Sequence, residues 1–485
     1  MIHISKGLVP FWDDYMIDRR FSTAELSVNR PVKKDSVMVF DKPWDGNAND
    51  FFTILKDDGF YRMYYETWSF FDPTYTEGIN VCYAESRDGL HWERPNLGMC
   101  EFRGSFDNNI IMTRIPDNIV VMKDDNPACL PEHRYKAIMA CKDVTGFLND
   151  NPERSRNGLI CKVSSDGIHF EDYCVISQGY AYDSQNSVHW NPHTKKYYCY
   201  FRDFHPKAEI PGSNLNETFV RGILVSESED FFNWTDPVPL NFGGCEDYPL
   251  YTNCIMAYPY DTRYYIGFPT RYVERKEWTE NYDRLCGADR RKKRIEREQR
   301  LGTALTDCIF MSSRDNMNWF RFDEACLTPG PEYPGNWVYG DCYPAIGGLV
   351  EIPSSFPGEP NEMSIYVFNH HWMPEKGNLI RYVYRRDGFA SVKSGYQPKI
   401  LRTPTFTFDG EELTINFRTS ARGNIYLQIL DEKGVPINGY KTCELFGDAL
   451  DRVVDFDKPL ADLQGRKVSF CFTMSDAEIY AMRFN

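Results

Sequence analysis

The sequence lacks any apolar run long enough to span a membrane. Residues 1–20 also lack a basic start followed by an apolar core and a small-residue cleavage site, so no signal peptide is predicted. No Cys-x-x-Cys pair and no Cys/His group has the spacing of a zinc site, and neither a metal nor a cofactor is expected. Positive charge is scarce too: 55 Lys and Arg stand against 70 Asp and Glu. The net charge of −15 argues against a nucleic-acid partner.

The cysteines do not form a disulfide framework in this interpretation. There are 15, an odd number, scattered and mostly inside apolar segments such as those around Cys82, Cys161 and Cys471. This pattern predicts reduced core residues in a cytoplasmic protein. Aromatic residues, in contrast, reach 15% of the chain. They suit β-strands and suit equally well a surface on which sugars stack.

A hairpin signal recurs along the chain. Residues 86–92 read Ser-Arg-Asp-Gly-Leu-His-Trp, and variants stand at 164–170, 228–234 and 313–319, with a shorter one at 386–389. Asp and Gly both tolerate the positive φ that a tight turn needs. The aspartates of successive copies are 64 to 85 residues apart. A unit that returns at such intervals predicts a radial repeat, here an all-β fold with a five-bladed β-propeller.

Three parts are predicted along the 485 residues. Residues 1–45 are irregular and are expected to wrap the ring or close it, and 46–397 form the propeller. Within it, 274–303 is a highly charged insertion, interpreted as solvated helices, with a lid or a subunit contact as the alternative. The composition then changes to alternating strands, which predicts a β-sandwich over 398–485. Both the insertion and the sandwich are candidate surfaces for a homo-oligomer.

A carboxylate stands at the start of the first strand of every predicted blade. These residues are Asp50, Asp117, Asp183, Glu246 (with Asp247) and Asp341. Such positions share one face of an up-and-down ring, opposite the hairpins. Carboxylates that converge on an aromatic-walled pocket are the equipment of a glycosidase, in which one acid protonates the leaving oxygen and another stabilises or attacks the oxocarbenium-like centre. Each of them would also serve as an ordinary turn residue.

The order of three short motifs resembles that of the five-bladed glycoside hydrolases. An Asn-Asp pair ends at Asp50, an Arg-Asp pair at Asp203 and a Cys-Glu pair at Glu246, similar to the order in glycoside hydrolase family 32 and its clan partner family 68. The resemblance covers 45–395 and implies that Asp50 is the nucleophile, Asp203 a transition-state stabiliser and Glu246 the acid/base. Here Phe, not Pro, follows both aspartates, and Cys precedes the glutamate. The chain therefore resembles a family-32-like bacterial group more than true invertases.

Further residues are expected to contact the substrate. They are Asp183, Arg202, Arg271, Asp307, Trp68, Asp341 and His370. Asp183 competes with Asp203 as the third carboxylate, because both belong to the same blade. Arg271 is either a ligand for a substrate carboxylate or phosphate, or the ion-pair partner of Glu246 or Asp307.

The predicted function is an exo-acting, retaining glycosidase. Its expected partner is a short oligosaccharide, a fructoside or another furanoside, with neither nucleic acid nor membrane involved. Two alternatives stay open. One is a glycoside phosphorylase on the same fold, with Arg202, Arg271, Arg381 and His370 as a basic anion site. The other is a sugar-binding propeller without catalysis, because a fold does not dictate chemistry.

Overall fold

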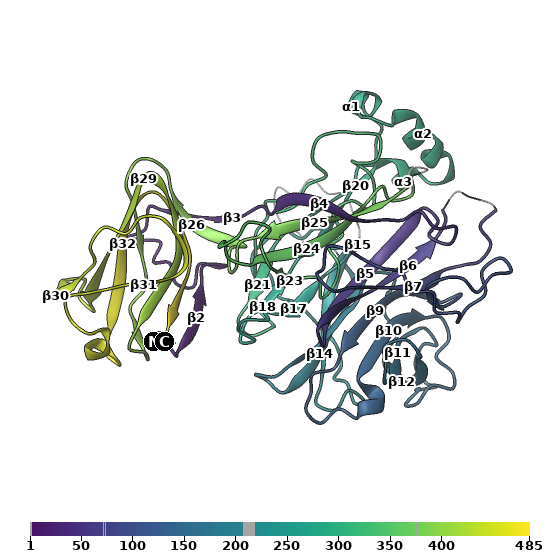
Figure 1. Ribbon diagram of the computed structural model, residues 1–485, viewed down its shortest axis with the longest axis horizontal. Helices are drawn as coiled ribbons and strands as arrows, with labels where there is room; N and C mark the ends of the chain where they lie inside the picture. The colour runs from purple at the N-terminus through teal and green to yellow at the C-terminus, as the bar shows by residue number, and fades with distance from the viewer. Residues whose placement is uncertain (1, 71, 73, 207–218, 374–375) are drawn as a thin grey trace. The chain divides into compact units, whose positions relative to one another are not determined.

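The computed structural model describes residues 2–70, 72, 74–206, 219–373 and 376–485. It contains two compact units (Figure 1). One unit is Val32–Val383, and the other combines Met1–Pro31 with Tyr384–Asn485.

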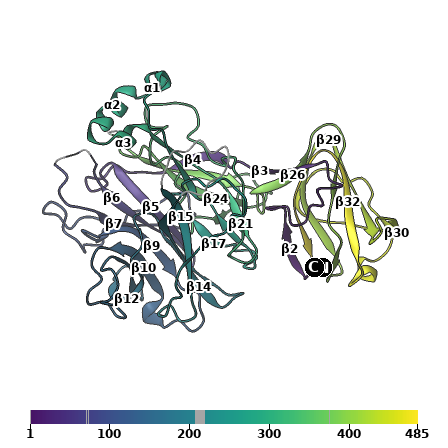
Figure 2. The same cartoon turned by 180° about the vertical axis from the view of Figure 1, so that it is seen from behind.

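The unit Val32–Val383 is a five-bladed β-propeller, which confirms the predicted fold class. Each blade is a four-stranded sheet, and the same blades are seen from behind in Figure 2. In order, the blades are β5 (Ala48–Asp57), β6 (Phe60–Trp68), β7 (Asn80–Ser86) and β8 (Ile110–Met112); β9 (Asp117–Lys123), β10 (Tyr135–Cys141), β11 (Gly158–Ser164) and β12 (Glu171–Gln178); β13 (Ser187–Asn191), β14 (Lys196–Pro206), β15 (Phe219–Ser228) and β16 (Val238–Pro239); β17 (Ile255–Ala257), β18 (Tyr265–Gly267), β21 (Met311–Ser313) and β22 (Trp319–Arg321); and β23 (Val350–Ile352), β24 (Glu362–Asn369), β25 (Asn378–Tyr384) and β4 (Val32–Val39).

A strand from the N-terminal part of the chain completes the last blade. β4 pairs antiparallel with β25, so the final blade is built from both ends of the propeller sequence. Within the segment 1–45, Val32–Val39 is the strand that closes the ring, whereas residues up to Pro31 belong to the other unit. That unit resumes at Tyr384, ahead of the expected start at 398, because β26 (Ala390–Ser394) pairs with β3 (Glu25–Val28) and β32 (Val468–Phe484).

Four copies of the repeat form the same turn. In the first, the Ser86 hydroxyl accepts a hydrogen bond from the N–H of Gly89 at 2.9 Å, and Asp88 Oδ1 accepts from the N–H groups of Leu90 and His91, both at 2.8 Å. The same bonds recur in the copies at 164–170, 228–234 and 313–319. These aspartates are therefore occupied by their own turns, and the hairpins are scaffold.

Two details of the blades differ from expectation. The hairpin at 86–92 implies a strand directly after it, but the outer strand of the first blade is β8, and Glu93 makes only an isolated bridge to Glu85. The short fifth copy at 386–389 lies in the connection from β25 to β26, because β4 takes the place of a following fourth strand.

The charged insertion in the fourth blade is helical, flanked by an antiparallel ribbon. The ribbon is β19 (Thr270–Glu274) with β20 (Ala304–Cys308). Between its strands lie α1 (Glu280–Arg284), α2 (Ala288–Arg297) and α3 (Gln299–Thr303). Figures 1 and 2 both show the three helices gathered at one edge of the propeller unit.

The other unit is a ten-stranded sheet folded around its own apolar core. Besides β3, β26 and β32, its strands are β1 (Ile2–Ile4), β2 (Gly7–Pro10), β27 (Lys399–Arg402), β28 (Phe406–Phe408), β29 (Leu413–Asp431), β30 (Pro436–Lys441) and β31 (Asp448–Val453). β29 and β32 pair over most of their length. Phe406, Phe408 and Phe470 are buried in the core, where the rings of Phe406 and Phe408 each contact that of Phe470.

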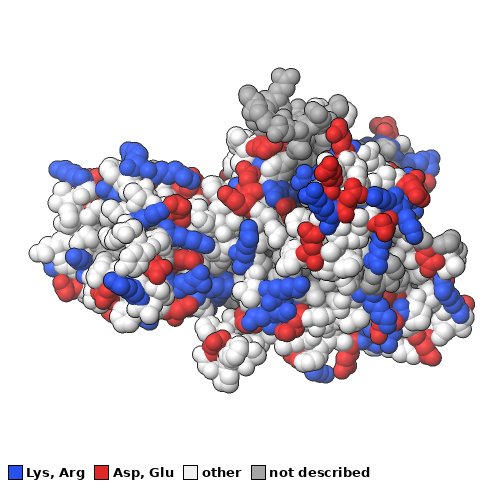
Figure 3. Space-filling model, turned by 90° about the horizontal axis from the view of Figure 1, so that it is seen from above, with Lys and Arg blue, Asp and Glu red and all other residues white. Residues whose placement is uncertain are grey.

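Charged side chains do not gather by sign on the face shown in Figure 3. Lys and Arg alternate there with Asp and Glu, so the net charge of −15 is not concentrated on this face. Within the described ranges, no helix is long and apolar enough to cross a membrane.

Candidate functional site

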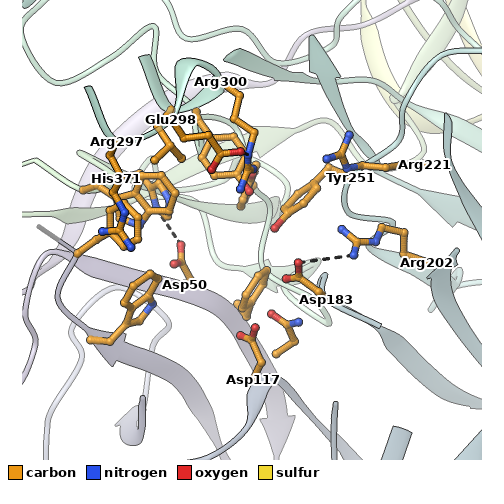
Figure 4. Close-up of a pocket in the computed structure, with 18 of the residues that line it drawn as sticks. Asp50, Asp117, Asp183, Arg202, Arg221, Tyr251, Arg297, Glu298, Arg300 and His371 are labelled. Carbon is orange, nitrogen blue, oxygen red and sulfur yellow. Dashed lines mark hydrogen bonds and ion pairs between the residues drawn. The ribbon is translucent and has the colours of Figure 1, made fainter. Parts of the chain in front are cut away.

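A cavity of about 440 Å³ lies in the propeller, where the first strands of three blades begin. Asp50, Asp117 and Asp183 line it, one from each of three successive blades, and Figure 4 shows the three carboxylates around one space. Asp50 lies in β5 at a bulge, where the register to β6 shifts before Thr53 and Phe51 has a φ of 49°. Such a bulge re-aims side chains that would otherwise follow the strand alternation.

Asp50 lies against a histidine. Its carboxylate lies 2.9 Å from Nδ1 of His371, and both side chains are buried. The contact has the distance of an ion pair but not the geometry of a hydrogen bond. A buried carboxylate needs such a partner, since its desolvation is otherwise unfavourable. The position of His371 depends on Gly340, which has a φ of 100° and on which a Cβ would stand 2.2 Å from the imidazole ring.

Asp117 is the carboxyl of the site whose pKa is raised to near neutrality. Burial raises its pKa to about 7, and the neighbouring carboxylates of Asp183 and Asp50 contribute to the rise. Behind it lies the fully buried Glu66, whose Oε1 accepts a hydrogen bond from the N–H of Ile119 at 2.6 Å. Among the described residues Glu66 Oε2 has no hydrogen-bond partner. Burial, together with the charge of Asp117, raises the pKa of Glu66 well above its usual range.

The third carboxylate of the cavity is Asp183, not Asp203. Asp183 is exposed to the cavity and lies 3.6 Å from Nη2 of the buried Arg202. Arg202 and Asp203 are adjacent in β14, and successive side chains of a strand point to opposite faces. Because Arg202 lines the central cavity, Asp203 points elsewhere, and its Oδ1 accepts from the N–H of Ala181 at 3.3 Å.

The three residues expected to act together are not brought together. Asp203 and Glu246 line a second cavity of about 600 Å³, whereas Asp50 lines the central one. Glu246 is exposed, and its backbone carbonyl accepts from Arg321 Nη2 at 2.6 Å. The physical reason is that β17 starts only at Ile255, so Glu246 lies well before the strand that it was expected to open.

Three other expected contacts also lie outside the central cavity. Arg271 pairs with both carboxylate oxygens of Asp307, at 2.7 and 2.6 Å, which is the structural alternative considered for this arginine. Asp341 is buried, and its Oδ2 accepts from the N–H of Val338 at 2.9 Å. These carboxylates stabilise the ribbon and a loop.

The aromatic wall is partly as expected. Trp68 lines the cavity together with Phe70 and Trp372, which stack on each other with ring centroids 4.3 Å apart. His370, the histidine expected here, lies 2.9 Å from the backbone carbonyl of Lys376 instead. Its neighbour along the chain, His371, occupies the site.

The insertion supplies residues that the sequence did not reveal. Its contributions to the cavity lining are Arg297, Glu298, Arg300 and Leu301. Two buried arginines of α2 fix loops of the propeller: Arg291 donates to the carbonyls of Asn336 and Trp337, and Arg294 Nη2 donates to the carbonyl of Trp372 at 2.6 Å. The insertion is therefore part of the wall, not a solvated excursion.

Comparison with known proteins finds similar solved structures at low sequence identity. No family model matches the chain, and neither does any curated protein. Among solved structures, one described as a glycoside hydrolase is 12% identical, covers 74% of this chain and 92% of its own, and has a TM-score of 0.43. A glycosyl hydrolase from Bacteroides ovatus is 12% identical, with coverages of 78% and 96% and a TM-score of 0.38. A structure from the GH130 family of mannoside phosphorylases, said to contain glycoside hydrolases, is 13% identical, with coverages of 80% and 99% and a TM-score of 0.38.

Proposed function

We propose that the protein is a glycosidase that cleaves short oligosaccharides in the central cavity. The observation that carries the proposal is the environment of Asp117: an acid with a pKa of about 7 beside two further carboxylates, in a space walled by aromatic rings. Glycoside cleavage needs a neutral acid and an ionised carboxylate within one site. A volume of about 440 Å³ lies within the usual range of small-molecule sites.

Each carboxylate then has a role. Asp117 protonates the leaving oxygen, and Asp50, oriented by His371, attacks the anomeric carbon. In the second half of the reaction Asp117, now ionised, takes a proton from the water that releases the sugar from Asp50. Asp183, held by Arg202, accepts hydrogen bonds from sugar hydroxyls. These assignments replace Asp203 and Glu246 as partners of Asp50.

An exo mode and retention of configuration remain part of the proposal. A bounded cavity suits the end of a sugar chain better than its middle. Retention requires carboxyl groups about 5–5.5 Å apart, and inversion about 6.5–9.5 Å. All 15 cysteines are unpaired, which supports the cytoplasm as the location.

The test is a panel of aryl glycofuranosides, aryl glycopyranosides and natural disaccharides, assayed with wild type, Asp117→Asn and Asp50→Asn. Loss of a general acid or a nucleophile should lower kcat by about 10²–10⁴-fold or more on whichever substrate is cleaved. NMR of the first-formed anomer reports retention or inversion. Full activity of both variants would show that the cavity is not the catalytic site, and a wild type that binds sugars without cleaving any would make the protein a sugar-binding propeller.

A further inference from the structure

A row of alternating arginines and aromatic rings runs along one wall of the central cavity. The guanidinium carbons of Arg202 and Arg221 lie 5.0 and 5.5 Å from the ring centroid of Phe204. Arg221 also lies 4.4 Å from the ring centroid of Tyr272, and the same tyrosine is a neighbour of Arg300. All three arginines line the cavity and form an arc in Figure 4. Three elements, β14, β15 and α3, thus bring three cations together.

The two outer arginines have carboxylate partners, and the middle one has none. Arg202 lies 3.6 Å from Asp183, and Arg300 Nε lies 2.5 Å from Glu298. For Arg221, the described part of the chain offers no carboxylate within 4.0 Å, and its buried Nε has no hydrogen-bond partner there. Arg221 therefore lies between two other cations with no carboxylate of its own, and a bound anion would stabilise it.

Packing alone does not account for this arginine. Stacking on two rings uses the faces of the guanidinium group, whereas its five N–H donors lie in the plane and remain to be used. A buried N–H donor without a partner lowers the stability of the folded state, whereas an apolar side chain stacked in the same place would leave no donor unpaired. A planar fork of donors matches two oxygens of a carboxylate or a phosphate.

The anion belongs in the central cavity rather than in the second one. Arg221 lines both. The central cavity has four arginines, Arg202, Arg221, Arg297 and Arg300, against four carboxylates, those of Asp50, Asp117, Asp183 and Glu298. The second cavity has two arginines, Arg221 and Arg321, against three carboxylates, those of Asp203, Glu246 and Asp247. The balance of charge therefore favours an anion in the central cavity.

We propose that Arg221, between Arg202 and Arg300, forms an oxyanion subsite of the central cavity. The inference rests on the proposed function in that it names the substrate class of that site. The oxyanion is either the carboxylate of a uronic acid residue in the substrate or inorganic phosphate that replaces water as the acceptor. In the second case phosphate attacks the anomeric carbon, the glycosidic oxygen takes the proton of Asp117, and the products are a sugar phosphate and the free leaving group.

Binding measurements test the oxyanion subsite independently of catalysis. Calorimetric titration of wild type with glucuronate, galacturonate, the matching neutral sugars and inorganic phosphate should show at least one anion binding about 10- to 100-fold tighter than the neutral sugars, as expected for a bidentate charged contact. Arg221→Gln should remove that preference, Arg221→Lys should retain part of it, and the exposed Arg275→Gln serves as the matched control. Thermal melting of each variant checks that it is folded.

Turnover then identifies the source of the anion. Faster cleavage of aryl uronides than of the matching neutral glycosides identifies a substrate carboxylate, and phosphate-dependent release of a sugar phosphate identifies phosphate. Equal binding of anions and neutral sugars by wild type, or an anion preference that survives in folded Arg221→Gln, overturns the subsite. Anion binding that Arg221→Gln abolishes, in a protein that cleaves no glycoside, would leave the subsite standing and refute the glycosidase.

Discussion

Replacing Asp117 by Asn should stabilise the protein at pH 8 while abolishing its activity. The pKa of Asp117 rises from 3.8 to about 7 on folding, chiefly through burial. Between these two values the unfolded chain has released this proton and the folded protein has kept it. The folded state therefore binds more protons, and the free energy of unfolding falls as the pH rises through this window. Asn resembles the protonated acid and does not titrate, so the variant escapes that loss.

The size of the effect follows from the shift. About three pKa units correspond to about 4 kcal/mol above pH 7, at about 1.4 kcal/mol per unit. At pH 5 only about 1.6 kcal/mol of this has developed, since the unfolded carboxyl has titrated little more than one unit. The stability difference between Asp117→Asn and wild type should therefore grow by about 2.5 kcal/mol from pH 5 to pH 8.

Urea unfolding followed by tryptophan fluorescence at several pH values measures this difference. The exposed Asp236→Asn is the control, and its difference from wild type should stay constant with pH. If the Asp117→Asn difference is also constant, Asp117 is ionised in the folded protein at pH 5. It would then not be the proton donor, whatever the variant's activity.

Three further outcomes are expected. Glu246→Gln and Asp203→Asn should change kcat by less than about threefold, because both residues line the second cavity. A loss of kcat as large as that of Asp117→Asn would instead support the roles that the motifs imply for Asp203 and Glu246. Arg294→Met should lower the free energy of unfolding by about 2–4 kcal/mol in urea titrations, since buried carbonyl groups lose their donor, and an unchanged midpoint would refute this account. Gly89→Ala should destabilise by about 1–3 kcal/mol through positive φ and a Cβ 2.6 Å from an isoleucine side chain, and by more than Gly98→Ala, which has positive φ but open space.

The blade count was predictable because each turn contains its own chemistry. Ser and Asp at fixed offsets make the turn's hydrogen bonds locally, and the residue after Asp has positive φ in every copy, whether Gly, Phe231 or Asn316. Four copies can therefore be recognised without knowing what packs around them. Two strands whose pairing does not depend on these turns, β4 and β8, were not predicted. β4 has an exposed, weakly alternating pattern and pairs with a strand more than 300 residues away, and β8 follows a long connection after its turn.

The candidate site was half predictable for the same kind of reason. The carboxylates converge in three blades, where each lies at its strand start or close to it: Asp117 opens β9, Asp50 is the third residue of β5 and Asp183 precedes β13 by four residues. The rule fails at Glu246, nine residues before β17, and at Asp341, which is buried nine residues before β23. Strand alternation alone would have separated Arg202 from its neighbour and favoured Asp183 as the third carboxylate.

The basic half of the cavity was beyond sequence reasoning because it combines elements that only the tertiary fold places together. Arg297 ends α2 and Arg300 lies in α3, in a stretch whose composition is that of a solvated helix, and nothing local distinguishes them from their exposed neighbours. Their role follows from α2, whose buried Arg291 and Arg294 bind backbone carbonyls of the propeller loops. One of these carbonyls belongs to Trp372, next to the histidine that holds Asp50. The insertion therefore fixes the wall beside Asp50 through α2 and adds Arg297 and Arg300 to the arginines of β14 and β15, so changes in it should alter substrate choice and catalysis together.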